Sequence, residues 1–310
     1  MLRDIRFSHA LIGLASLVLA GCVAAPTPPT MPAPAPPRPD TASETAAFAA
    51  YYRNIEARLV GDGLLRTDDG SRDTMLTPEM LAGNFERIAL YSEYALSDGR
   101  FVARETPSTL RRWGGAVRLQ PHFGASVPAA QRAQDRSVLS TYAARLAQVS
   151  GHPIRTVEQG GNFHVLYLNR EEQVNAGALI RQLMPGASDA TIDEIERMPR
   201  SIFCAVYAFS QSGQAPVYVS AIAIIRAEHP DLLRRSCVHE EVAQGLGLPN
   251  DSPDVRPSIF NDDDEFALLT RHDELLLRML YDRRLSVGMT PGSARDTVRL
   301  IAEEYLGQAS

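Results

Sequence analysis

The sequence predicts a single α+β domain with a mixed, twisted sheet, preceded by a small helical layer. Short apolar runs of strand length alternate with longer stretches of helical periodicity after residue 108, which is typical of a sheet covered by helices. The chain is 45% hydrophobic and 22% charged, ordinary values for a globular protein that buries a core. We divide its 310 residues into a signal peptide (1–21), a Cys and Pro-rich tether (22–41), a helical layer (42–108) and the α+β domain (109–310).

The N-terminus has the layout of a bacterial export signal. Two arginines precede the apolar run 10–20, which is too short to span a bilayer permanently, and a small-residue cleavage site follows. Its end, Leu-Ala-Gly-Cys, is similar to the lipobox in which the cysteine, here Cys22, becomes the lipidated first residue. Val23 follows, as in outer-membrane lipoproteins. We expect a lipid anchor, including palmitate, in the outer membrane with the body facing the periplasm; a plain secretory signal with an incidental Cys is the alternative.

The next segments predict a tether and then helices. Nearly every second residue over 26–39 is Pro, which favours extended polyproline II and a semi-rigid spacer. The stretch 41–60 is predicted to be a helix. A second helix is predicted to start at Thr77-Pro78, where the Thr caps the helix and the Pro lies in its first turn.

The elements expected in the α+β domain follow from their periodicity and from the Gly and Pro residues between them. The strands are 116–119, 154–157, 163–168, 203–209 and 217–225, the last two as a hairpin; the helices are 131–149, two short ones before Pro185 and Pro199, one after Pro230, 270–283 and 293–305.

Charge excludes one class of partner. The formal net charge is −6, all 31 cationic residues are Arg, and the sequence shows no basic stripe. Nucleic-acid binding requires a basic surface that neutralises phosphates, so we expect no such partner.

Residues 239–251 (HEEVAQGLGLPND) have the spacing of a zinc-peptidase helix with its ligands exchanged. In HExxHxxGxxH enzymes two His ligands lie four residues apart on one helical face, the Glu activates water, and a Gly turns the chain toward the third ligand. Here Glu240, Gln244 and Asn250 occupy the three ligand positions, Glu241 that of the general base and Gly247 the turn. A Glu favoured near a helix start by the macrodipole is the alternative interpretation of Glu241.

This domain resembles the metzincin and matrixin metallopeptidases, and it is similar to a proteobacterial family of lipoproteins of unknown function. The segments that carry the resemblance are Leu110–Trp113, Leu246–Asp251 and Pro257–Asn261, the last with Phe260 where such enzymes carry the Met of their Met-turn. The resemblance implies a zincin-like fold in which Gly247, Asp251 and Phe260 support the turn and the site.

The ligand chemistry leaves the cofactor unknown. Catalytic zinc needs three protein ligands of imidazole, thiolate or carboxylate type; Glu240 is suitable, whereas Gln244 and Asn250 are weak ligands. Calcium or magnesium prefers six or more oxygens, which Asp251 and the acidic run 262–265 would have to complete, unless that run is a solvated loop. His239 has Ala243 four residues on and lies about 100° from Glu240 around the helix, so packing is the better interpretation.

Two cysteines remain after Cys22, and an exported compartment is oxidising. We expect Cys204 and Cys237 to form a disulfide that links the motif helix to a strand, with two buried thiols as the alternative.

Three functions remain open. The ligand chemistry favours a binding module that lost catalysis, for a peptide or envelope protein that pairs with the sheet edge. The second is a metal-dependent hydrolase in which Glu241 deprotonates water and Glu240, Gln244 and Asn250 help to hold the ion. The third is a purely structural envelope lipoprotein.

Overall fold

The computed structural model describes residues 41–97, 100–210 and 216–307, all within one compact unit, Pro39–Ser310. The expected signal, Cys22 and the tether up to residue 40 lie outside the described residues. In the described part of the chain, no helix has both the length and the apolar character needed to cross a bilayer.

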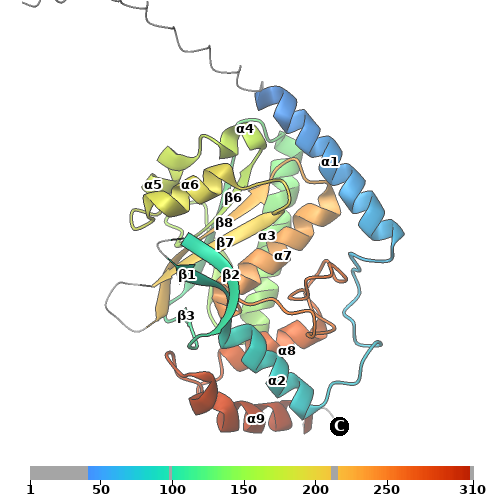
Figure 1. Cartoon of the computed structure of the whole chain (residues 1–310), viewed down its shortest axis with the longest axis vertical. Helices are drawn as coiled ribbons and strands as arrows, with labels where there is room; N and C mark the ends of the chain where they lie inside the picture. The colour runs from blue at the N-terminus through green and yellow to red at the C-terminus, as the bar shows by residue number, and fades with distance from the viewer. Residues whose placement is uncertain (1–40, 98–99, 211–215, 308–310) are drawn as a thin grey trace, which may run out of the picture. The chain divides into compact units, whose positions relative to one another are not determined.

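The first elements are two helices and a hairpin (Figure 1). Helix α1 is Thr41–Gly61 and α2 is Pro78–Ala89, capped by the Thr77 side chain, which accepts from the Met80 amide. Strands β1 (Tyr91–Ser97) and β2 (Arg100–Pro107) then pair antiparallel. The prediction of a wholly helical layer over 42–108 is therefore wrong for its last quarter, because these residues satisfy their backbone groups across the hairpin.

The main sheet is mixed, as the sequence predicts, and most of its strand pairs are parallel. Its strands are β3 (Arg112–Trp113), β4 (Val117–Phe123), β5 (Ile154–Thr156), β6 (Phe163–Leu168), β7 (Cys204–Ser210) and β8 (Val217–Arg226). Their order is β3-β8-β6-β4-β5, with every one of these pairs parallel, and β7 pairs antiparallel with β8. The predicted hairpin of the last two strands is confirmed, and its turn, 211–215, lies outside the described residues.

Helices cover both faces of this sheet (Figure 1). They are α3 (Ala129–Ser150), α4 (Arg170–Gln173), α5 (Gly177–Leu183), α6 (Asp189–Arg197), α7 (Asp231–Gly247), α8 (Arg271–Leu280) and α9 (Pro291–Gly307). In β6 the residues Phe163, Val165 and Tyr167 join the main core with α3 and α7, while Leu166 and Leu168 pack against α5 and α6. Strand β6 is apolar at nearly every position because successive side chains meet opposite covered faces.

Aromatic contacts hold α1 against the domain. Tyr52 is fully buried and makes edge-on ring contacts with Phe203 and His229. Beneath it lies Arg226, also fully buried, whose guanidinium faces the Tyr52 ring and donates to Gln173 Oε1 and to the carbonyl of Met198. The Arg226 cation is thus desolvated but hydrogen-bonded, the condition under which a buried charge is tolerated.

Candidate functional site

The motif helix α7 is fastened to the sheet by a disulfide. The Sγ atoms of Cys204, the first residue of β7, and Cys237 are bonded, with 5.8 Å between their Cα atoms. The predicted disulfide is confirmed, and the alternative of two free thiols is wrong. Helix α7 packs along β7 and β8, and Trp113 Nε1 donates to the carbonyl of Gly245, which ties the helix to β3 as well.

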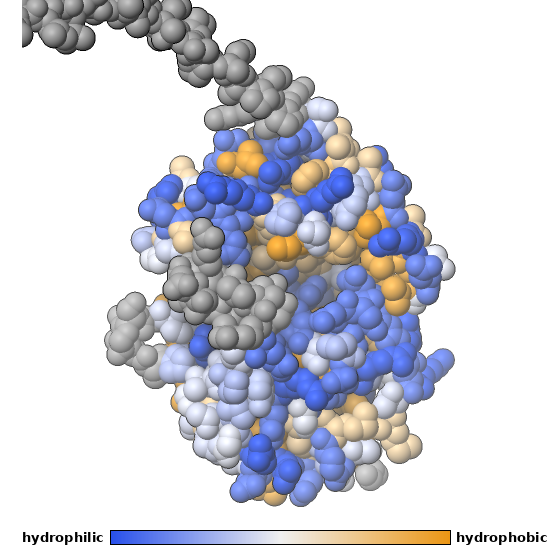
Figure 2. Space-filling model, in the orientation of Figure 1, coloured by the Kyte–Doolittle hydropathy of each residue, from blue (hydrophilic) through white to orange (hydrophobic). Residues whose placement is uncertain are grey.

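An acidic cavity of about 270 Å³ lies where α7, the start of β7 and the loop after α7 meet. Five carboxylates and one amide line it: Glu240, Glu241, Asp251, Asp262, Asp264 and Asn261. The lining among the described residues also includes Ser201, Phe203 and Cys204 but no basic side chain. In the view of Figure 2, the loop after α7 belongs to a hydrophilic surface between α1 and α8. Two residues of the acidic run, Asp262 and Asp264, thus line the cavity, while Asp262 and Asp263 are exposed to solvent.

Electrostatics inside this cavity disfavour full ionisation. Burial raises the pKa of Asp262 and of Asp264, and the charge of Asp263 adds to the effect at both residues. Glu241 is only 4% exposed. It lies in the C-terminal half of α7, which begins at Asp231, so the interpretation of Glu241 as a helix-start residue is wrong. A cationic group entering the cavity would relieve this repulsion between carboxylates.

The three exchanged ligand positions do not converge. Glu240 lines the cavity. Gln244 Nε2 instead donates to both carboxylate oxygens of Asp251, at 2.9 and 3.0 Å. Asn250 is 1% exposed, and its Nδ2 donates to the carbonyl of Arg87 at 2.9 Å, which anchors the turn to α2. The structure therefore brings together Glu240, Glu241 and Asp251, and it places Asn250 in the fold's interior.

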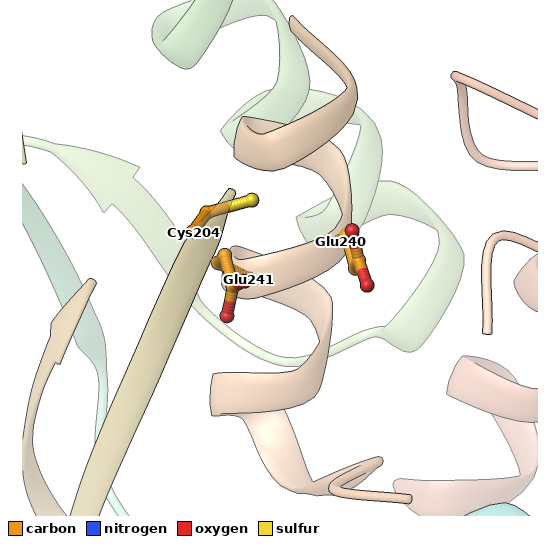
Figure 3. A group of neighbouring side chains, drawn as sticks. All are labelled: Cys204, Glu240 and Glu241. Atoms are coloured by element: carbon orange, nitrogen blue, oxygen red, sulfur yellow. The ribbon is translucent and has the colours of Figure 1, made fainter. Parts of the chain in front are cut away.

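These donors do not fit a catalytic zinc ion. Ligand atoms of Cys204, Glu240 and Glu241 lie within 4.8 Å of one another, and Figure 3 shows the Cys204 sulfur directed from its strand toward the helix that carries both glutamates. The Cys204 sulfur is consumed in the disulfide, however, and cannot act as a thiolate. Among the described residues, Asp251 does not join this 4.8 Å group. Two carboxylates, Glu240 and Glu241, therefore remain close enough to share an ion, one fewer than the three protein ligands of a catalytic zinc site.

The remaining motif residues shape the turn. Gly247 has φ +130°, and a Cβ there would lie 2.2 Å from the carbonyl oxygen of Arg111. Only glycine allows this backbone conformation and this close approach. Phe260 is fully buried in the main core, and its carbonyl accepts from the Ser252 amide.

His239 has a packing role. Its ring stacks on Tyr142 with 3.9 Å between centroids, and its Nδ1 accepts from the Leu269 amide at 3.0 Å. Burial lowers the pKa of His239 to about 3, so the ring is neutral, as this acceptor role requires.

The fold and site together define a disulfide-linked α+β domain whose motif helix borders an acidic cavity. The chain belongs to the DUF2927 family, described as proteins of unknown function, whose family model matches residues 78–300. That match begins with α2 and ends within α9, so it includes the sheet and the motif helix. No curated protein and no solved structure matches the chain.

Proposed function

We propose that this protein is a cell-envelope lipoprotein whose zincin-like domain binds an extended peptide without hydrolysing it. The observation that carries the proposal is the acidic cavity between the motif helix and the start of strand β7. At two of the three metal-ligand positions, Gln244 is hydrogen-bonded to Asp251 and Asn250 to the Arg87 carbonyl. The cavity would receive a basic side chain of the peptide. The protein would be attached to the membrane through the lipid on Cys22. It would not bind nucleic acid.

The sheet supports the relationship to zincins. Strands β5, β4, β6 and β8 run parallel in that order, and β7 adds to β8 in the opposite direction. The motif helix follows β8 directly and packs along β7. This is the mixed sheet with a motif helix that the sequence resemblance implies.

Backbone pairing supports an extended peptide as the ligand. Strand β7 pairs antiparallel with β8 at the margin of the main sheet, and addition of a strand at a sheet margin is a general way to bind an extended peptide. Cys204 at the start of β7 lines the cavity. A peptide paired with β7 would therefore place one side chain close to the carboxylates, where opposite charge stabilises the complex and selects against acidic peptides.

The side chains around the motif helix favour binding over hydrolysis. Glu241 could act as a general base, but Cys204 is oxidised, and the Gln244 and Asn250 side chains are held by hydrogen bonds to Asp251 and to the Arg87 carbonyl. Their amide oxygens, which would have to bind the ion, are weak ligands for zinc. The donor set therefore favours binding over the hydrolase alternative.

The lipid anchor is expected to be visible by metabolic labelling. Bacteria that express the full chain and are grown with labelled palmitate should incorporate the label into this protein. The Cys22→Ser variant should lose it, because the thiol is the acceptor. Equal labelling of both proteins would exclude Cys22 as the lipidation site.

Peptide binding is tested by calorimetry on the full chain. We expect a seven-residue peptide with a central Arg to bind, and the same peptide with a central Glu to bind at least tenfold more weakly. Glu241→Gln and Asp262→Asn should each weaken binding of the Arg peptide by about tenfold, since a desolvated charge pair is lost. Glu303→Gln, which changes an exposed residue of α9, is the matched control and should have no effect.

Elemental mass spectrometry of the same preparation separates the proposal from its alternatives. Stoichiometric zinc that is lost in a Glu240→Ala variant would favour the hydrolase. No preference between the Arg and Glu peptides, with a correctly folded protein, would contradict the basic-peptide proposal and leave the structural role.

A further inference from the structure

A second and larger cavity, of about 1150 Å³, has the opposite charge. It lies between the end of α3, helix α8 and the C-terminal helix α9. Five arginines line it, Arg145, Arg271, Arg278, Arg283 and Arg284, against two carboxylates, Glu274 and Asp282. This local excess of positive charge occurs in a chain whose net charge is −6.

Two of the five guanidiniums are neutralised within the protein. Arg145 Nε pairs with Glu274 at 2.8 Å. Arg284 pairs with Asp282 and with Glu304, each at 2.8 Å, and this contact lowers the pKa of Asp282 to about 2. Both carboxylates of the lining are therefore already paired with Arg145 or Arg284.

The other three arginines have no such partner. Within the described side chains, no carboxylate lies at ion-pair distance from Arg271, Arg278 or Arg283. Arg278 is held over the Tyr305 ring, 4.3 Å from its centroid, and Tyr305 is fixed in turn by a hydrogen bond to Asp282. The Arg278 guanidinium is thus positioned before any ligand arrives, which reduces the entropy lost on binding.

Their spacing indicates a ligand with more than one anionic group. Arg271 and Arg278 are seven residues apart on α8, which places their Cα atoms on one face and roughly 10 Å apart along its axis. Arg283 follows three residues after the end of α8 and lines the same cavity. Guanidinium groups bind phosphate through two parallel hydrogen bonds. The three arginines carry a total charge of about +3. Two phosphate groups, each of about −1.5 to −2 charge, balance this charge better than two carboxylates do.

We propose that this cavity, the arginine cavity, binds a ligand that carries at least two phosphate groups. The ligand is either a soluble phosphorylated molecule or the headgroup of a phosphorylated lipid. The proposal is independent of peptide binding at α7, because the two cavities share no lining residue.

Calorimetry of the full chain with tripolyphosphate, at fixed ionic strength, tests the proposal. We expect binding that weakens at least tenfold in an Arg271→Gln, Arg278→Gln, Arg283→Gln triple variant. The control is the Arg53→Gln, Arg72→Gln, Arg299→Gln triple variant, which removes the same charge from exposed sites elsewhere and should bind like the wild type. The single Arg283→Glu variant alters a residue that forms no ion pair with any described side chain, and it provides a second test if the triple variant unfolds.

Three results would overturn the proposal: no binding by the wild type, equal losses in the two triple variants, or equally tight binding of a tri-glutamate peptide. Vesicles identify the source of the phosphate. Binding to vesicles that contain cardiolipin, whose headgroup carries two phosphate groups, over phosphatidylcholine vesicles would assign a lipid headgroup if it is lost in the arginine-cavity variant but kept in the control. Binding of tripolyphosphate alone would assign a soluble ligand.

Discussion

Replacing Gly247 with alanine is expected to lower the free energy of unfolding by about 4 kcal/mol, near the upper end for a single substitution. The glycine has φ +130°, outside the conformations that alanine readily adopts. The new Cβ would also lie 2.2 Å from the Arg111 carbonyl oxygen, and backbone cannot move aside as a flexible side chain can. Either the turn after α7 or the segment before β3 must shift to remove this contact.

Urea unfolding followed by Trp113 fluorescence measures this effect, since the Trp113 indole donates to Gly245 close to the substitution. The matched control is Gly151→Ala at the end of α3. Gly151 has φ +67°, but a Cβ there meets no atom within 4 Å. Only the cost of the left-handed conformation, about 1 kcal/mol, is expected at Gly151. Equal losses in the two variants would show that the contact with Arg111 does not matter.

Replacing Glu228 with glutamine is expected to stabilise the protein by about 3 kcal/mol at pH 9 and to have little effect at pH 4. Both carboxylate oxygens of Glu228 are shielded from solvent, and burial raises its pKa to about 7 against the attraction of Arg226. The unfolded chain has the ordinary pKa near 4.5. The folded state therefore binds more protons between pH 4.5 and 7, and stability falls as pH rises through that window, then levels off.

Chemical denaturation of wild type and variant at several pH values tests this prediction. Buried neutral histidines such as His239 also make stability depend on pH below 6.5, but they are present in both proteins and cancel in the difference. Glu303→Gln, at an exposed position, should show no pH-dependent difference. A Glu228→Gln effect of the same size at pH 4 and pH 9 would mean that ionisation of Glu228 is not its cause.

Local patterns were sufficient for most of the architecture. Alternation and turn residues predicted the β7–β8 hairpin, and the oxidising compartment implied by the signal layout predicted the bond between Cys204 and Cys237. The absence of a ligand four residues after His239 predicted its packing role, which the contact with Tyr142 explains. The β1–β2 hairpin was missed because its strands follow two clear helices, and nothing nearby suggested that the helical layer ended there.

The ligand positions show the limit of that local information. The motif spacing aligns Glu240, Gln244 and Asn250 with the three metal-ligand positions. It does not determine which residues each side chain contacts in the folded protein. Asn250 contacts α2, a helix more than 160 residues earlier in the chain, and Gln244 turns to Asp251. The acidic run after residue 261 gained its place in the cavity wall in the same way, from the path of its loop.

The sequence by itself determined the α+β class, the disulfide pair, the glycine turn and the exchange of imidazoles for carboxylate and amides, because each follows from residue type and local spacing. Only the tertiary structure decided that five carboxylates share one cavity and that three unpaired arginines share another. Both cavities join segments far apart in the sequence, and the positions of their charges depend on how helices and loops pack around the sheet.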